Sequence, residues 1–288
     1  MTPAGLLVGL VAALLAAAGS TNIGQRFLAD RSAAAGGTHP HELLTREIAR
    51  QWTAAAVKDV PAPPTQLRVV TLNTGLIAVT PLMAERLELI LASGILREYD
   101  IVALQEVTLA ADAARIVAKA RELGLGYAHA FDGGVGISFW PGCQGTGLLV
   151  LSRWPMQETV YRRYVVNGKP ERIHHFDYYG SKGMGLCRIA LGDSTLNLYV
   201  THMHAMYTDN YSDQAAGVAD EYEQHRAAQA LQLSEFVRAT SSSADLTLAV
   251  GDFNSLPNSL AMRTVHTLGG LRDGKHPSPT CNPHLPLT

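Results

Sequence analysis

Residues 246–257 read LTLAVGDFNSLP, and this stretch places a carboxylate and an amide directly after a short apolar run. The run is rich in Leu and Val, which predicts a β-strand. Asp252 and Asn254 follow it, and a hydrophobic core rarely selects such side chains. Three further apolar runs end in the same way. They are LRVVTLN ending at Asn73, IVALQE ending at Glu106, and LNLYVTHMH ending at His202 and His204.

From residue 66 onward, short apolar runs alternate with amphipathic helical segments, which is typical of an α/β fold whose strands are covered on both faces. Strands are expected at residues 67–72, 101–105, 148–151, 186–191, 196–201 and 246–250. Helices are expected at residues 83–96, 110–123 and 221–237. The pattern therefore predicts an α/β sandwich over residues 66–288.

The polar residues that follow the strands are expected to meet, because strand ends form the ligand crevice of an α/β sheet. Taken singly, each residue has an ordinary structural explanation, such as a turn cap for Asn73 or an Asx turn at Asp252. Their joint placement after four strands favours a site. We expect two carboxylates, two amides and two imidazoles at one rim.

The residue types indicate a reaction class. Glu106, with nearby Asn and Asp oxygens, is a hard-ligand set that suits Mg²⁺, whereas zinc favours nitrogen and sulfur. Phosphoester hydrolysis needs a metal, a carboxylate for the attacking water and donors for the developing charge. Asp252 can serve the water, and Asn73, Asn254 and His202 can serve the phosphate. The sequence has no Gly-x-Ser-x-Gly motif and no P-loop, which favours direct attack by water.

Composition excludes several classes of protein. The 288 residues include 47% hydrophobic and 17% charged residues, and the formal net charge is −2. Disorder is therefore excluded as the main state, and there is no overall basic field to attract nucleic acid. Cys143, Cys187 and Cys281 lack metal-ligand spacing and are odd in number, so they indicate neither a zinc site nor a disulfide framework.

The N-terminal 65 residues differ from the rest of the chain. Residues 1–25 carry no charged side chain, and the sequence fits an uncleaved membrane anchor or, as the alternative, a cleaved signal that leads to secretion. Residues 26–65 are typical of a linker, with an amphipathic helix expected at residues 41–57. We expect membrane association through the apolar segment.

Two motifs carry a resemblance to a known superfamily. LQEV around Glu106 and GDFNSLP around Asp252 and Asn254 are similar to motifs of the deoxyribonuclease I-like metal-dependent phosphodiesterases and phosphatases. The resemblance covers residues 67 to about 281 and implies a four-layer α/β sandwich. Because nucleases, deadenylases, inositol phosphatases and sphingomyelinases share these motifs, they imply the fold and not the substrate.

Longer stretches resemble the neutral sphingomyelinases, which release phosphocholine from sphingomyelin. The stretches are CQGTGLLVLSRWPM, NGKPERIHHFDYYGSKGMGL, VTHMHAMY and EYEQHRAAQALQLSEFV. The resemblance implies that Glu106 is the principal Mg²⁺ ligand with Asn73 nearby, and that Asp177 and Lys182 gate access of the substrate. Taken alone, Lys182 is typical of a solvated loop.

By the same resemblance, His202 and Asn254 stabilise the phosphoryl group and Asp252 positions the water. The expected partner is sphingomyelin or a related phospholipid in a membrane. His225 lies within a predicted helix, which favours a structural role for it.

Two departures from the resemblance matter. The first strand is followed by LNTGLI instead of the family's N-x-N-x-W-G. The sequence also contains no Ser-Asp-His, the motif whose His is the family's general base. We therefore expect a chain truncated at its C-terminus, without the final strands of the fold, and impaired turnover.

Two other functions stay open on the sequence alone. A nuclease or deadenylase of the same superfamily would share GDFNSLP, although no basic groove is evident in the composition. An inactive membrane-bound interaction protein that keeps the fold would explain the missing Ser-Asp-His motif.

Overall fold

A computed structural model describes residues 60–62, 64–77, 80, 82–131, 145–172, 175, 177–207 and 220–274. Residues 57–288 form one compact unit. The predicted anchor at 1–25 and the helix at 41–57 lie outside the described residues, as does most of the predicted linker. No helix in the described ranges has the length and apolarity needed to cross a membrane.

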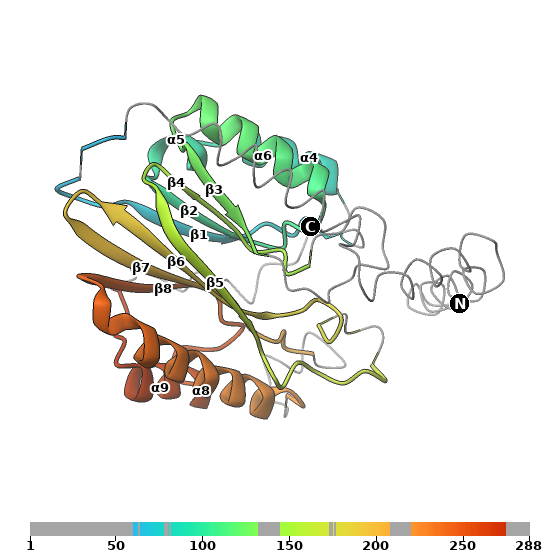
Figure 1. Cartoon of the computed structure of the whole chain (residues 1–288). Helices are drawn as coiled ribbons and strands as arrows, with labels where there is room; N and C mark the ends of the chain where they lie inside the picture. The colour runs from blue at the N-terminus through green and yellow to red at the C-terminus, as the bar shows by residue number, and fades with distance from the viewer. Residues whose placement is uncertain are drawn as a thin grey trace, which may run out of the picture. The chain divides into compact units, whose positions relative to one another are not determined.

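Two four-stranded sheets form the centre of the fold (Figure 1). The first has the order β1-β2-β4-β3 and the second β5-β6-β7-β8. The strands of the first sheet are β1 (Val69–Asn73), β2 (Ile101–Gln105), β3 (Tyr127–Ala130) and β4 (Leu149–Ser152). Those of the second are β5 (Met156–Arg163), β6 (Gly183–Leu191), β7 (Ser194–His202) and β8 (Leu246–Asp252).

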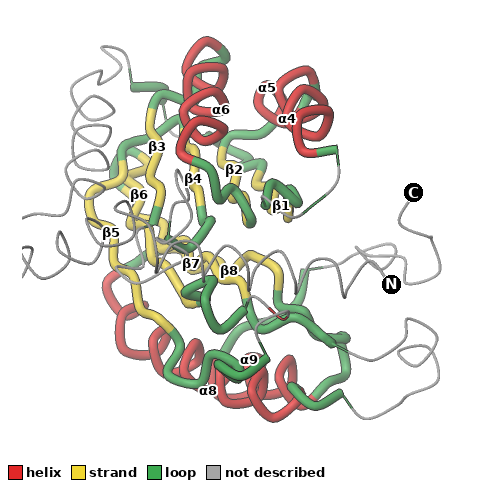
Figure 2. Tube along the Cα trace, turned by 90° about the vertical axis from the view of Figure 1, so that its right-hand side faces the viewer, coloured by secondary structure: helices red, strands yellow, loops and turns green. Residues whose placement is uncertain are grey.

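Helices cover the outer face of each sheet, so the layers run helix, sheet, sheet, helix (Figures 1 and 2). The first sheet is covered by α4 (Met83–Ala92), α5 (Ile95–Glu98) and α6 (Ala110–Glu122). The second is covered by α8 (Glu223–Thr240) and α9 (Leu260–Gly269), with the short turn η2 (Ser241–Ser243) between α8 and β8. This arrangement is the four-layer α/β sandwich that the sequence predicts.

Burial of apolar side chains holds the layers together. One cluster fills the space between the sheets and includes Phe131, Trp154, Cys187 and Val200. A second joins the β5-β8 sheet to its helices and includes Tyr199 and Leu233. Cys187 is fully buried and free, as expected of a small core residue. Cys143 and Cys281 lie outside the described residues.

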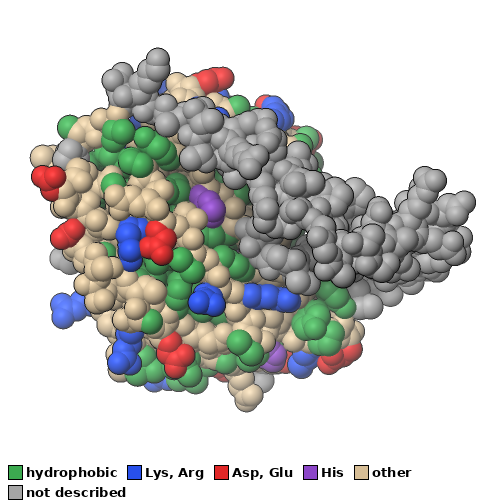
Figure 3. Space-filling view, in the orientation of Figure 1, with side chains coloured by type: hydrophobic (Ala, Val, Ile, Leu, Met, Phe, Trp, Pro, Cys, Tyr) green, Lys and Arg blue, Asp and Glu red, His purple; other side chains and the backbone are tan. Residues whose placement is uncertain are grey.

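Strand direction positions the site. β1 pairs with β2 in parallel, and β7 pairs with β8 in parallel, so each sheet sends two neighbouring carboxyl ends to one edge. The register pairs Asn73 with Gln105 in one sheet and His202 with Asp252 in the other. On the face seen in Figure 3, basic and acidic side chains are interspersed and form no continuous basic band.

Several expected boundaries differ from those observed. The expected helix at 83–96 is two helices, because the chain turns at Ser93 and Gly94. The strands β3 and β5 and the helix α9 were not expected. Strand β2 matches its expected range, and β6, β7 and β8 extend beyond theirs.

Candidate functional site

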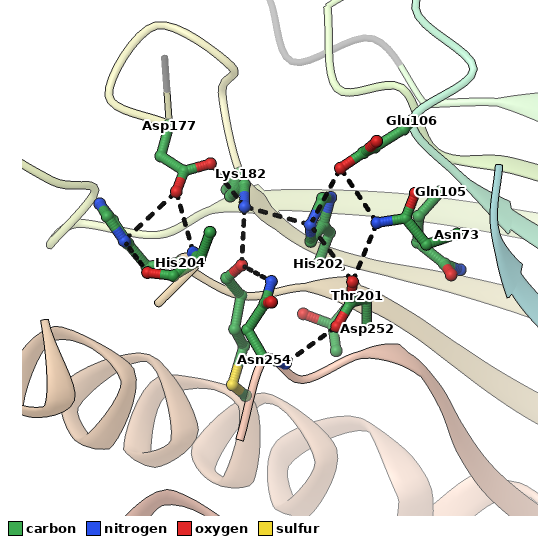
Figure 4. Close-up of polar contacts among 12 residues, drawn as sticks. Asn73, Gln105, Glu106, Asp177, Lys182, Thr201, His202, His204, Asp252 and Asn254 are labelled. Atoms are coloured by element: carbon green, nitrogen blue, oxygen red, sulfur yellow. Dashed lines mark hydrogen bonds and ion pairs between the residues drawn. The ribbon is translucent and has the colours of Figure 1, made fainter. Parts of the chain in front are cut away.

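Two carboxylates from different sheets share one hydrogen-bond donor (Figure 4). Asn73 Nδ2 donates to Glu106 Oε1 at 3.0 Å and to Asp252 Oδ2 at 2.9 Å. Asn73 Oδ1 accepts from the backbone N–H of Gly75 at 3.1 Å, which fixes the orientation of the amide. Asn73 therefore turns its nitrogen to the carboxylates. It thus positions the carboxylates of Glu106 and Asp252 and does not present its oxygen as a metal ligand.

His202 lies beside both carboxylates. Its Nε2 is 3.9 Å from Glu106 Oε1 and 3.8 Å from Asp252 Oδ2. Lys182 Nζ lies 3.1 Å from the same nitrogen. Because an ammonium only donates, His202 Nε2 accepts, and the ring proton is on Nδ1. Burial, together with the charge of Lys182, lowers the pKa of His202 to about 3, so the ring is neutral at pH 7.

Asp177 and Lys182 form a buried ion pair behind His202. The distance from Lys182 Nζ to Asp177 Oδ1 is 2.5 Å, and both side chains are almost fully buried. Although burial alone raises the pKa of Asp177, the charge of Lys182 holds it below its ordinary value. The reading of Lys182 as a solvated loop residue is therefore wrong. The ammonium lies between Asp177 and His202, as Figure 4 shows.

The segment that follows β7 connects these groups. The Met203 carbonyl accepts from Lys182 Nζ and from Asn254 Nδ2, each at 2.9 Å. The Ala205 N–H donates to Asp177 Oδ2 at 2.8 Å. The backbone of residues 203–205 thus holds the Asn254 amide, the Lys182 ammonium and the Asp177 carboxylate in fixed positions. We call this segment the post-β7 hub.

His204 does not lie beside Glu106 and Asp252, contrary to the expectation of two imidazoles at one rim. Its Nδ1 lies 3.3 Å from Asp177 Oδ2 and 2.9 Å from the Ala205 carbonyl oxygen. The ring stacks on Tyr222 with a centroid distance of 3.9 Å. Burial lowers the pKa of His204 to about 4. His204 is therefore a buried neutral group that supports Asp177.

Helix α8 contributes residues that the sequence prediction missed. Gln229 is fully buried, its Oε1 accepts from the His204 N–H at 2.8 Å, and its Nε2 donates to the Val166 carbonyl at 2.8 Å. Arg226 Nη1 donates to the Ala205 carbonyl at 3.3 Å. A glutamine and an arginine on the buried face of a helix are the signal that could have identified them.

The backbone at the site is unusual. Glu106 has a φ of 61° and Asn254 has a φ of 46°, in the left-handed region that few residues other than glycine adopt. Such a conformation costs about 1 kcal/mol per residue, and it is commonest where function requires it. The turn at Glu106 aims its carboxylate away from the core. The Asn254 N–H donates to Asp252 Oδ1 at 3.0 Å.

The electrostatics of the carboxylates favour a cation. Burial raises the pKa of Glu106, and the neighbouring Asp252 charge raises it further. Burial also acts on Asp252, but the neighbouring His202 and the hydrogen bonds from Asn73 and the Asn254 N–H hold its pKa below the ordinary value. Asp252 is therefore the better ionised of the two, and Glu106 gains most from a positive partner.

The donor set fits Mg²⁺ better than zinc. In the described part of the chain, no three His, Cys, Asp or Glu residues group closely enough to hold a metal by themselves. Mg²⁺ keeps several waters and is commonly held by one or two carboxylates plus substrate phosphate. Glu106 and Asp252, bridged by one amide, supply that number of ligands.

A family model matches more than half of the chain. The profile of the endonuclease/exonuclease/phosphatase family matches residues 82–287. The chain belongs to this family. The matched residues include Glu106, Asp177, Lys182, His202, Asp252 and Asn254.

Relatives within the family carry sphingomyelinase names. The chain is 37% identical to a neutral sphingomyelinase candidate of Drosophila melanogaster over 204 residues, which cover 69% of this chain and 42% of that one. It is 39% identical to human sphingomyelin phosphodiesterase 2 over 135 residues, which cover 47% and 30%. The chain thus spans less than half the length of these relatives.

The fold is also found in solved structures. A crystal structure of a mutant of beta toxin from Staphylococcus aureus, with bound magnesium ions, has a TM-score of 0.58 and 17% identity. The match covers 73% of this chain and 72% of that one. The likeness confirms the α/β sandwich fold that the sequence predicts.

Proposed function

We propose that this chain catalyses the Mg²⁺-dependent, phospholipase C-type hydrolysis of sphingomyelin or a related sphingolipid. The observation that carries the proposal is the position of His202 Nε2 within 3.9 Å of both Glu106 and Asp252, although the two carboxylates come from different sheets. The relatives with sphingomyelinase names support the choice of substrate. The products would be ceramide and phosphocholine.

The side chains have separable roles in the proposed reaction. The Asp252 carboxylate accepts a hydrogen bond from the attacking water and orients it toward phosphorus. Asn254 has a second amide hydrogen beyond the one given to Met203, and it can donate to a phosphoryl oxygen. Lys182 supplies a buried positive charge beside His202. The P–O bond to ceramide breaks, the new P–O bond comes from water, and the proton that water loses balances the one that the ceramide oxygen takes up.

Glu106 and Asp252 would hold the metal. When bound, Mg²⁺ neutralises phosphate oxygens and lowers the energy of the developing charge. Asn73 would keep the two carboxylates at their separation. Its position between them explains why an amide serves better here than a third acid.

The proposal is tested by phosphocholine release from sphingomyelin vesicles, with Mg²⁺ and with EDTA, set against hydrolysis of an oligonucleotide. We expect release with Mg²⁺, loss of release with EDTA, and an intact oligonucleotide. Cleavage of the oligonucleotide alone would identify a nuclease. Metal binding without any turnover would identify an inactive interaction protein. Either result would overturn the proposal.

We also propose that turnover by these 288 residues is low. Their sequence contains no Ser-Asp-His motif, and loss of a general base commonly costs about 10²- to 10⁴-fold in rate. The test compares this chain with a version that carries a genuine Ser-Asp-His. Equal turnover of the two proteins would overturn this part of the proposal.

Residues 1–25 are proposed to keep the protein at a membrane. The absence of charge over these residues supports the proposal. N-terminal sequencing of the mature protein tests it. An intact Met1 on membrane-bound protein is expected, and cleavage after the alanine run would indicate secretion instead.

A further inference from the structure

Exposed apolar side chains gather at the end of the fold that holds the site. Strands β1 and β8 end there, since Asn73 contacts Asp252. Strand β5 ends there too, because its last residue, Arg163, pairs with Gly183, and the next residue of β6, Met184, pairs with Thr201 beside His202. Figure 2 faces this end of the molecule. Among the described residues, its exposed large apolar side chains are Leu82 (57% exposed), Val165 (88%), Tyr178 (36%), Leu256 (66%) and Leu260 (49%). We call these five the apolar rim.

Three of the rim residues lie close to site residues along the chain. Leu256 comes four residues after Asp252. Val165 follows Tyr164, whose hydroxyl makes a 2.6 Å hydrogen bond with Thr201 Oγ1. Tyr178 follows Asp177 directly. Single exposed apolar residues are normal on soluble proteins, but five around one site mark an interaction surface.

Leu82 adds an independent observation. Its φ is 60°, in the left-handed region, although its side chain is largely exposed. A leucine in this conformation carries a steric cost, because its Cβ approaches the following carbonyl oxygen. Because the Leu82 side chain is largely exposed, contacts within the described fold offset little of that cost. Such strain is commonest at functional segments.

The charge around the rim indicates what it contacts. Residues 74–77 and 253–260 carry no charged side chain. The nearby Lys169 is 2.6 Å from Glu221 Oε2, and Arg172 is 3.8 Å from the same oxygen. Lys169 and Arg172 are matched in number by Glu171 and Glu221, so this part of the surface carries little net charge and offers little to an anionic partner. Arg163 also lies beside the rim, where its Nη2 donates to the Tyr178 carbonyl at 3.0 Å. A largely apolar surface of low net charge suits a bilayer of zwitterionic lipid.

We propose that the apolar rim inserts into a zwitterionic lipid bilayer and so brings the carboxylates of the site to the headgroup phosphodiesters. The inference rests on the proposed function and specifies how its substrate is reached. Leucine and valine would lie below the headgroups, and Tyr178 would lie at their level, where tyrosine is favoured. A second copy of the chain is the other possible occupant, and the experiment separates the two.

The test measures local insertion, so that membrane binding by residues 1–25 does not obscure it. Single cysteines replace Leu256 or Val165 in a full chain that also carries Cys143→Ser and Cys281→Ser, and each is labelled with an environment-sensitive nitrobenzoxadiazole dye. The vesicles contain phosphatidylcholine without sphingomyelin. No turnover is therefore needed, and failure of the proposed hydrolysis leaves this measurement valid.

Two matched positions serve as controls. Leu89 is 69% exposed but lies in the middle of α4, and Leu246 is 50% exposed but begins β8 at the opposite end of the sheet. We expect vesicles to increase dye emission several-fold, with a blue shift, at Leu256 and Val165 and to change it less than about twofold at the controls. The response should persist when NaCl rises from about 0.1 to 0.5 M, because no ion pairs drive it.

Three outcomes would overturn the inference. Equal responses at rim and control positions would indicate non-specific adsorption. A response that high salt abolishes would indicate an electrostatic surface. A response without vesicles, together with dimers in sedimentation, would identify a second copy as the occupant. The labelled positions are exposed, so each labelled protein is expected to keep the circular dichroism spectrum of the unlabelled chain.

Discussion

Asn73 occupies a position where only a donor is tolerated. Its amide nitrogen contacts Glu106 and Asp252 at the same time. Asn73→Asp would place a third carboxylate there without changing side-chain volume, so like charges would replace two hydrogen bonds. We expect a lower melting temperature in EDTA and activity reduced by about 10²-fold.

Added metal distinguishes this repulsion from simple misfolding. Mg²⁺ should raise the melting temperature of Asn73→Asp more than that of the wild type, since a cation relieves three carboxylates instead of two. Differential scanning fluorimetry measures both proteins. A variant that is equally stable with and without metal would contradict the assignment of Asn73.

His129 predicts a pH dependence of stability. Burial lowers its pKa to about 4 from an ordinary value near 6.5, so between these values the unfolded state binds more protons than the folded state. Stability should therefore fall as pH decreases from 6.5 toward 4, by about 1 to 3 kcal/mol from this residue. His202 and His204 act in the same direction.

His129→Leu isolates the contribution. Urea unfolding at pH 7 and pH 5 should show a smaller loss of stability for the variant than for the wild type. The dependence of the free energy of unfolding on pH should become weaker without vanishing, because the other two buried histidines remain. An unchanged slope would show that His129 is not neutral and buried in the folded protein.

At this scale, sequence analysis succeeds where chemistry follows a strand. Glu106, His202 and Asp252 come directly at or after apolar runs, so their convergence is predictable from strand direction. Lys182 and Gln229 have no such signal. Their burial depends on partners 20 to 63 residues away, such as Val166 for Gln229, which spacing does not reveal.

The contact of β7 and β8 depends on one glycine. Gly251 has a φ of 140°, and a Cβ there would overlap the backbone of Thr201. Because backbone cannot move aside as a side chain can, Gly251→Ala should destabilise the fold by more than about 3 kcal/mol and disturb Asp252 next to it. Urea unfolding measures the loss.

Gly270 provides the matched control. It also has a positive φ, 67°, but a Cβ there would meet nothing within 4 Å. Gly270→Ala should therefore cost only the conformational penalty, about 1 kcal/mol. Similar losses at both positions would show that the contact with Thr201 is not decisive.

Helix α8 positions the post-β7 hub through Gln229. Gln229→Leu would leave the His204 N–H and the Val166 carbonyl without their buried partner, which costs about 1 to 3 kcal/mol for each group. We expect lower stability and a reduced kcat, since the hub holds Lys182 and Asn254. Gln224→Leu, on the exposed side of the same helix, should change stability by less than about 0.5 kcal/mol. A Gln229→Leu protein with normal kcat would contradict the positioning role.

Element prediction fails where local pattern and tertiary context differ. Strand β5 reads MQETVYRR, in which polar residues interrupt the apolar ones, because it is an edge strand with exposed positions. Strand β3 is only four residues long and contains Ala and His. Its strand conformation comes from pairing with β4, which local propensity does not encode.

At the scale of the whole domain, the site lies at the junction of the two sheets. Glu106 follows β2 of the first sheet, and Asp252 ends β8 of the second. A cation between them would therefore join two layers that are otherwise held by apolar packing. Metal binding and domain stability are coupled for this reason, and either can be used to measure the other.

Titration with Mg²⁺ measures this coupling. For a dissociation constant of about 1 mM, 10 mM Mg²⁺ would add about 1.4 kcal/mol, which corresponds to a rise of about 3 to 6 °C in melting temperature for a domain of this size. Glu106→Gln keeps the volume and one acceptor oxygen but removes the charge, so it should abolish most of the rise while leaving stability in EDTA nearly unchanged. A large loss of stability in EDTA would mean that Glu106 is a structural residue. An unchanged response to Mg²⁺ would mean that the two sheets do not share a cation at this point.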